Sequence, residues 1–156
     1  LYAVLKDPVF LVAFAASIAE AASDTWAGEI GQLSSKDPLS IATFTKVPKG
    51  ISGGVTVLGL LASLAASLSV ALLFWGTFGT DLWGLLLIAA SGFLGALFDS
   101  LLGATLQVQY RRKDGSLTED PKEGERARGV PFMDNDAVNL LSGLFAFSVA
   151  VALYSL

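Results

Sequence analysis

Residues 53–76 read GGVTVLGLLASLAASLSVALLFWG, a run without one charged side chain. An α-helix needs about 20 apolar residues to cross the roughly 30 Å hydrocarbon core of a bilayer. The whole chain of 156 residues is 53% hydrophobic and only 15% charged, a composition typical of an integral membrane protein. We therefore expect residues 53–76 to form a membrane-spanning helix.

The chain holds three further apolar stretches of similar length, at residues 8–30, 82–109 and 135–156. Each predicts another spanning helix, so the expected fold is all-α, a polytopic integral membrane bundle of about four transmembrane helices. We expect a single membrane domain over residues 1–156, with connecting loops at about 31–52 and 110–134. Because the sequence starts at Leu1 and not at Met, we expect it to be part of a longer protein.

The basic residues predict how the bundle is oriented in the membrane. Nine of the ten Lys and Arg residues lie in the two long loops: Lys36, Lys46, Lys49, Arg111, Arg112, Lys113, Lys122, Arg126 and Arg128. The 76–81 segment is rich in Gly and Thr and carries Asp81 but no base, so it predicts a tight turn on the other side. By the positive-inside rule both loops face the cytoplasm or its equivalent.

Composition limits the chemistry that the chain can perform. The sequence contains no Cys and no His, which excludes thiolate nucleophiles, imidazole bases and the usual zinc sites. The net charge of −4 and the absence of a broad basic surface argue against nucleic acid as a partner. The groups that remain available for chemistry are carboxylates, amides, hydroxyls and the basic side chains of the loops.

Four carboxylates lie within or at the edge of the apolar stretches: Glu20, Asp24, Asp99 and Asp136. A charge at the centre of a bilayer costs roughly 2.5–3.5 kcal/mol on insertion scales, so each needs a partner, a water-filled cavity or a metal. With the predicted orientation all four fall at the cytoplasmic end of their helices. The alternative is that they are protonated or amide-paired groups that only fix helix packing.

Helical spacing gathers other polar and small residues around these carboxylates. Glu20 and Asp24 share one helix face, and Asp99 shares its face with Gly95. Oxygen ligands of this kind suit Mg²⁺, which binds through carboxylates, water and substrate phosphates. The candidate metal ligands are Glu20, Asp24, Asp99, Asn135 and Asp136, and the candidate catalytic residues are Asp24, Asp99 and Asp136.

The first loop predicts a phosphate-binding segment. Its residues 46–54 read KVPKGISGG, in which glycines expose backbone N–H groups just before a helix and two lysines add positive charge. This is not a Walker A motif. The candidate phosphate or substrate ligands are Lys46, Lys49, Ser52, Gly53, Gly54 and Asn139.

Several strings in the chain also resemble a known family. They are AEAASDTWA at 19–27, EIG at 29–31, SGGV at 52–55, Gly95, DSLLGA at 99–104 and NDAVN at 135–139. In this order they resemble the integral-membrane family that includes transmembrane protein 19 and the plastid phytyl-phosphate kinase of vitamin E synthesis. Gly28 and Ile51 stand where the family pattern has Ser and Thr. Family members carry further hydrophobic segments before the first motif, so the resemblance implies N-terminal helices ahead of Leu1.

The resemblance implies a phosphotransferase that acts on an isoprenoid monophosphate, phytyl phosphate in plants, with CTP or another nucleoside triphosphate as donor. The expected product is a prenyl diphosphate, the expected cofactor is Mg²⁺, and the expected location is the cell membrane, or a plastid membrane in a plant. A nucleotidyltransferase that makes a CDP-activated lipid, an ion or proton transporter and a structural subunit remain alternatives. Whether the chain forms a homo-oligomer in the lipid bilayer stays open.

Overall fold

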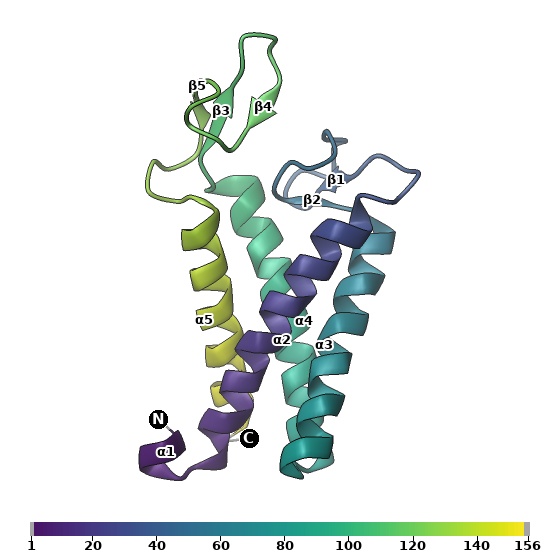
Figure 1. The fold of residues 1–156 in the computed structure, drawn as a ribbon, viewed down its shortest axis with the longest axis vertical. Coiled ribbons are helices and arrows are strands. Elements are labelled where there is room, and N and C mark those ends of the chain that lie inside the picture. The colour runs from purple at the N-terminus through teal and green to yellow at the C-terminus, as the bar shows by residue number, and fades with distance from the viewer. Residues whose placement is uncertain (1, 155–156) are drawn as a thin grey trace.

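The computed structural model describes residues 2–154 and consists mainly of helices. Four helices are long and apolar enough to cross a membrane: α2 (Pro8–Gly31), α3 (Val57–Phe78), α4 (Leu82–Thr105) and α5 (Asn135–Tyr154). A short helix, α1 (Tyr2–Leu5), precedes them (Figure 1). The prediction of an all-α, four-helix membrane bundle is confirmed.

Polar residues in the connections define where the long helices begin. The Asp7 carboxylate accepts from the Val9 N–H at 3.0 Å before α2, and Asp81 accepts from the Gly84 N–H at 2.8 Å before α4. Asp134 accepts from the Ala137 N–H at 2.9 Å at the start of α5. Each side chain satisfies a backbone donor that has no partner within its own helix.

Two helices are shorter than the hydropathy of the sequence predicts. The second was expected to begin at residue 53, but Gly54–Val55 forms strand β2, which pairs antiparallel with β1 (Leu39–Ser40), and α3 begins only afterwards. The third was expected to continue to residue 109, but α4 ends at Thr105 and β3 (Gln109–Arg111) follows. Strand β3 lies between β4 (Leu117–Thr118) and β5 (Glu125–Arg128) in an antiparallel sheet.

Helix α2 is the centre of the bundle and contacts α3, α4 and α5. Small residues allow this close approach: Ala15, Ala16 and Ala19 are fully buried. At Gly92 of α4 a Cβ atom would lie 2.5 Å from the Ala19 Cβ, so only glycine fits there. Small residues at helix interfaces are the usual basis of packing in membranes, where burial of apolar surface gives little advantage over lipid.

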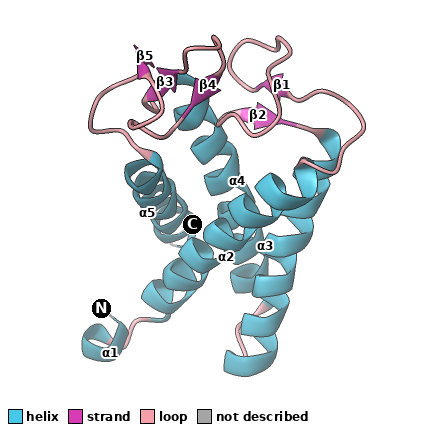
Figure 2. Cartoon of the chain, turned by 45° about the horizontal axis from the view of Figure 1, so that its top comes forward, coloured by secondary structure: helices cyan, strands magenta, loops and turns pink. Residues whose placement is uncertain are grey.

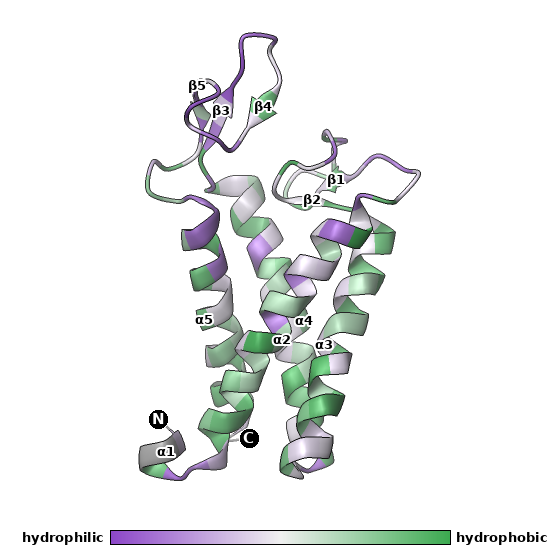
Figure 3. Cartoon of the chain, viewed as in Figure 1, coloured by the Kyte–Doolittle hydropathy of each residue, from purple (hydrophilic) through white to green (hydrophobic). Residues whose placement is uncertain are grey.

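Both long loops, with their short strands, lie at the same end of the bundle, and the 79–81 turn lies at the other (Figures 1 and 2). Helices α3 and α4 meet at that turn, and α2 crosses in front of α4 near the middle of the bundle and lies beside α3 at the loop end (Figure 1). The loop end is the more hydrophilic one, whereas the far halves of the long helices are mainly apolar (Figure 3).

Candidate functional site

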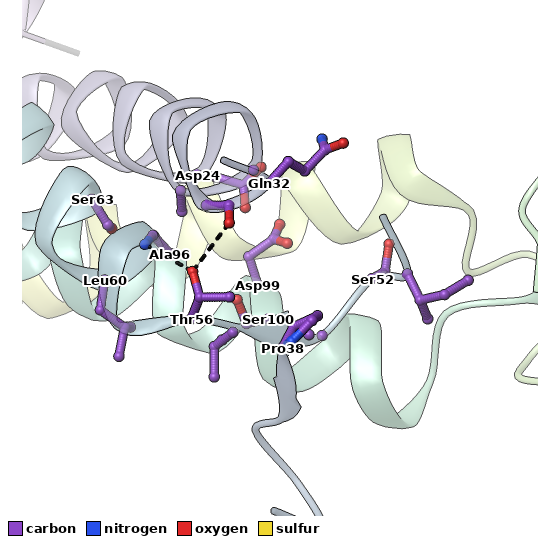
Figure 4. Close-up of a pocket in the computed structure, with 18 of the residues that line it drawn as sticks. Asp24, Gln32, Pro38, Ser52, Thr56, Leu60, Ser63, Ala96, Asp99 and Ser100 are labelled. Carbon is purple, nitrogen blue, oxygen red and sulfur yellow. Dashed lines mark hydrogen bonds between the residues drawn. The ribbon is translucent and has the colours of Figure 1, made fainter. Parts of the chain in front are cut away.

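A cavity of about 200 Å³ lies at the loop end, where α2, α3 and α4 diverge beneath the first loop. Its lining includes Asp24 from α2, Asp99 from α4, Lys49 and residues 50–54 from the first loop, and Asn135 from α5. Figure 4 shows Asp24 and Asp99 close together within it, with Ser52 and Ser63 on opposite sides of them. The structure therefore brings residues from four separate parts of the chain to one cavity.

Asp99 is the centre of the polar contacts. It is buried, and its Oδ2 accepts a hydrogen bond from the Ser142 hydroxyl of α5 at 2.9 Å. The Asp24 carboxyl lies close to it in the same cavity (Figure 4). With its amide nitrogen turned toward Asp99, Asn139 donates to the same Oδ2 at 3.1 Å and accepts from the Asn135 amide at 3.2 Å. Three helices thus fix the position of a single carboxylate.

Glu20 lies one helical turn deeper than Asp24 and does not line the cavity. It is only 3% exposed, and Ser142 of α5 lies beside its carboxyl group. A Cβ atom at Gly95 would lie 2.5 Å from the Glu20 Cγ, so the absence of a side chain in α4 creates the space that Glu20 occupies. Ser142 therefore lies next to Glu20 as well as Asp99.

Asp136 is not brought into the cavity. Its side chain is exposed, whereas Asn135 lines the cavity and Asn139 reaches Asp99. Successive residues of a helix are rotated by about 100°, so neighbours in sequence face different directions. The face that α5 presents to the site carries Asn135, Asn139 and Ser142, at i, i+4 and i+7. Ser142 was not a candidate, although this spacing could have identified it.

The two candidate lysines have different positions. Lys49 is one of the lining residues, and its ammonium donates to the Gln32 carbonyl at 3.1 Å and to the Ser34 carbonyl, both just after α2. Lys46 lies outside the cavity lining and forms an exposed ion pair with Asp37 at 3.1 Å. Only Lys49 is placed to bind an anion in the cavity.

The glycine segment of the first loop packs directly on the end of α4. Gly53 has φ +82°, and a Cβ atom on it would lie 2.4 Å from the Ala104 nitrogen, so both conformation and space require glycine there. The Ser52 N–H and hydroxyl both donate to Glu119 Oε1, the N–H at 3.3 Å. Glu119 belongs to the second loop, and no pattern in the sequence connects it with Ser52.

The Thr56 hydroxyl ties this segment to the helices on either side. It donates to the Gly31 carbonyl at 3.3 Å and accepts from the Gly59 N–H at 3.0 Å, as the dashed lines in Figure 4 show. The first hydrogen bond reaches the end of α2 and the second caps α3. Thr56 therefore fixes residues 52–56, which line the cavity, to the end of α2 and to the start of α3.

The oxygen atoms at the site match the ligands that Mg²⁺ prefers. Asp24 and Asp99 lie together, and no Lys or Arg of residues 2–154 forms an ion pair with either. Neighbouring carboxylates repel each other unless they share a proton or a cation. The described part of the chain contains no group of three acidic side chains that could hold a metal ion, so water or substrate phosphates would have to complete the coordination.

The sequence comparisons place the chain among membrane proteins. It is 38% identical over 143 residues to "Protein PGR" of Arabidopsis thaliana, an alignment that covers 83% of this chain and 50% of that protein. It is 33% identical over 144 residues to an uncharacterized membrane protein of Methanocaldococcus jannaschii, covering 92% and 51%. An uncharacterized membrane protein of Synechocystis is 28% identical over 140 residues, covering 90% and 46%.

The chain thus spans about half the length of the curated relatives it matches. No solved structure matches it. Residues 1–147 match the family described as integral membrane protein DUF92. The chain therefore belongs to the DUF92 family of integral membrane proteins.

Proposed function

We propose that the cavity is the phosphoryl-transfer site of a membrane-embedded kinase for isoprenoid monophosphates. The donor is a nucleoside triphosphate, CTP by the resemblance, and the acceptor is a prenyl monophosphate such as phytyl phosphate. The observation that carries the proposal is that two adjacent carboxylates, a lysine and a glycine-rich segment line one cavity at the loop end of the bundle. Such a site can hold phosphate groups while an apolar tail stays in the bilayer.

In the proposed reaction an oxygen of the acceptor phosphate attacks the terminal phosphorus of the donor. A new P–O bond forms, the bond to the bridging oxygen breaks, and the nucleoside diphosphate leaves with that oxygen and its electron pair. A phosphate monoester is largely ionised at neutral pH, because its second pKa is about 6. The reaction therefore needs no strong general base, in keeping with a chain without His.

The contacts of the cavity suggest a role for each side chain. Lys49 and the backbone of 52–54 would hold phosphate oxygens, and Asp24, Asp99 and Asn135 would hold Mg²⁺. When bound, Mg²⁺ neutralises negative charge on the donor phosphates. The hydrogen bonds from Ser142 and Asn139 orient the Asp99 carboxylate. Lys46 and Asp136 lie outside the cavity lining and take no direct part in this scheme.

The proposal is tested by product analysis on the purified protein in lipid vesicles. CTP, ATP and GTP are each offered with prenyl phosphates of different chain length, with and without Mg²⁺. We expect a nucleoside diphosphate and a prenyl diphosphate in equal amounts, and only with Mg²⁺. Release of pyrophosphate with a nucleotide-linked lipid would instead identify a nucleotidyltransferase, and ion uptake without any nucleotide would identify a transporter.

The two lysines provide a matched pair of variants. Lys49→Ala is expected to raise the KM for donor or acceptor about 10- to 100-fold, because it removes a charge that lines the cavity. Lys46→Ala removes the same charge from the same loop outside the lining, where an exposed ion pair contributes only about 0–1 kcal/mol. Equal KM values in the two variants would contradict the assignment of the phosphate site.

A further inference from the structure

The cavity is lined by residues of α3 and α4 as well as by the two carboxylates. Its lining includes Leu60 of α3 together with Leu97 and Ser100 of α4, and all three side chains are half-buried. We propose that the isoprenoid tail of the acceptor leaves the cavity through an opening between α3 and α4, with Leu60 and Leu97 at its two edges. This inference rests on the proposed function and adds the path by which its lipid substrate is bound.

The helix geometry determines the direction of the opening. Gly59 packs against α2, since a Cβ atom there would lie 2.9 Å from the Ala27 carbonyl oxygen. Leu60 follows it and is rotated by about 100° away from α2. On α4, Gly95 faces α2 and α5, and Leu97 lies about 200° around the helix from it. Both leucines are therefore rotated away from the contacts that Gly59 and Gly95 make with α2.

Two of the other helix pairs are closed by direct contacts. A Cβ atom at Gly31 of α2 would lie 3.3 Å from the Gly59 Cα of α3, so the two helices leave no space for a lipid tail between them at this point. Helices α4 and α5 are closed by the stacked rings of Phe98 and Phe145, whose centroids are 4.3 Å apart. The α3–α4 opening is thus the lateral route that the cavity lining indicates.

The size of the cavity requires that the tail lie outside it. Pockets that enclose drug-sized ligands measure roughly 300–1,000 Å³, whereas this one measures about 200 Å³, which suits phosphate groups and not a long isoprenoid. Withdrawing the tail from the bilayer into water is opposed in proportion to its apolar surface. A lateral opening lets the phosphate enter the cavity while the tail remains in an apolar environment.

The surface next to the opening is suited to such a tail. One turn deeper, Leu64 of α3 is 47% exposed and Phe93 of α4 is half-buried.

Ser63 also lines the cavity, is 2% exposed, and its hydroxyl has no hydrogen-bond partner among the described residues. A buried hydroxyl without a partner is unfavourable. An oxygen of the phosphate ester, at the junction of headgroup and tail, would supply the missing partner.

Narrowing the opening tests the route. Leu60→Trp and Leu97→Trp are each expected to raise the KM for phytyl phosphate about tenfold or more relative to the KM for a five-carbon prenyl phosphate. The matched controls are Leu61→Trp and Leu101→Trp, which add the same side chain at neighbouring exposed positions outside the cavity lining. An equal effect of the controls, or an equal loss with both acceptors, would overturn the proposed route.

A second measurement does not depend on turnover. A phytyl phosphate analogue with a diazirine near the middle of its tail is photolysed with the unmodified protein in vesicles, and the labelled peptides are identified. We expect labels on α3 and α4 around Leu64 and Phe93. An excess of unlabelled phytyl phosphate should prevent this labelling. Labels confined to α2 or α5, or no competable label, would overturn the route. Labels at the expected positions without phosphoryl transfer would overturn the kinase proposal and leave the lipid site standing.

Discussion

At the level of single residues, Asp99 and Asp136 can be compared directly, because Asp99 lines the cavity and Asp136 lies outside the lining. Asp99→Asn keeps the shape of the side chain and removes its charge, so we expect kcat to fall about 100-fold or more while the helical content is unchanged. Asp136→Asn, on an exposed side chain, is expected to change kcat less than about threefold. Steady-state kinetics and circular dichroism would measure both, and a larger loss in Asp136→Asn would place that residue in the site.

Gly95 shows how one absent side chain makes room for a buried acid. In Gly95→Ala the added Cβ atom would lie 2.5 Å from the Glu20 Cγ and 2.9 Å from the Ala146 Cβ. Overpacking of this kind costs roughly 1–3 kcal/mol, so we expect a lower temperature of thermal unfolding in detergent. Gly76→Ala is the control, because nothing lies within 4 Å of its added atom. The idea fails if both variants unfold at the same temperature.

The residues of the site were predictable to different extents. Asp24, Asp99 and Asn135 could be placed together because apolar runs, helical spacing and two basic loops determine depth and face. Asp136 could not be placed correctly by this reasoning, since a shift of one residue at a helix start rotates a side chain by about 100°. Glu119 contacts Ser52 across 67 positions of sequence, and no local pattern carries that information.

At the level of elements, the β3–β5 sheet is stabilised by a charged contact that depends on pH. Glu123 Oε2 accepts from the Thr118 hydroxyl at 2.8 Å and from Arg112 Nε at 2.9 Å. The Thr118 hydrogen bond and then Arg112 lower the pKa of Glu123 below its ordinary value of 4.5. The contact therefore stabilises the sheet at a pH above 4.5, and this stabilisation is lost as the pH falls through the lowered pKa.

We accordingly expect amide hydrogens of residues 109–128 to lose protection, measured against the intrinsic exchange rate, when the pH falls from about 6 to about 3. Hydrogen exchange followed by NMR would record this in detergent micelles. In Glu123→Gln the side chain does not titrate, so the loss of protection should be smaller. The same pH response in both proteins would assign the effect to another group.

The short strands explain why two helix ends differed from their predicted positions. Hydropathy detects whether a segment is apolar and does not detect a few backbone hydrogen bonds made outside the bilayer. Gly54–Val55 is apolar enough to extend a spanning helix, but its pairing with Leu39–Ser40 gives its backbone other partners. The same holds for Gln109, whose neighbour Tyr110 pairs with Thr118. Tertiary contacts override local preference at such ends.

At the level of the whole molecule, the positions of the basic loops give a test of orientation. The chain has no Cys, so single-cysteine variants report one position each. In sealed vesicles, Lys36→Cys and Lys113→Cys should react with an impermeant maleimide from one side, and Thr77→Cys only from the other. The positive-inside rule predicts that the first side is cytoplasmic. Labelling of Lys36→Cys and Lys113→Cys from opposite sides would rule out the four-span arrangement.

The contact between Glu119 and Ser52 connects two halves of the chain that also pack through α2 and are joined covalently at the 79–81 turn. One half holds α2, α3 and Lys49, and the other holds α4, α5 and Asp99, so the cavity belongs to neither alone. We therefore expect the two halves to assemble when they are made as separate chains. Residues 1–79 and residues 80–156, expressed together, should copurify. Glu119→Gln should weaken recovery of the pair more than it destabilises the uncut chain, where the turn keeps both halves at high effective concentration.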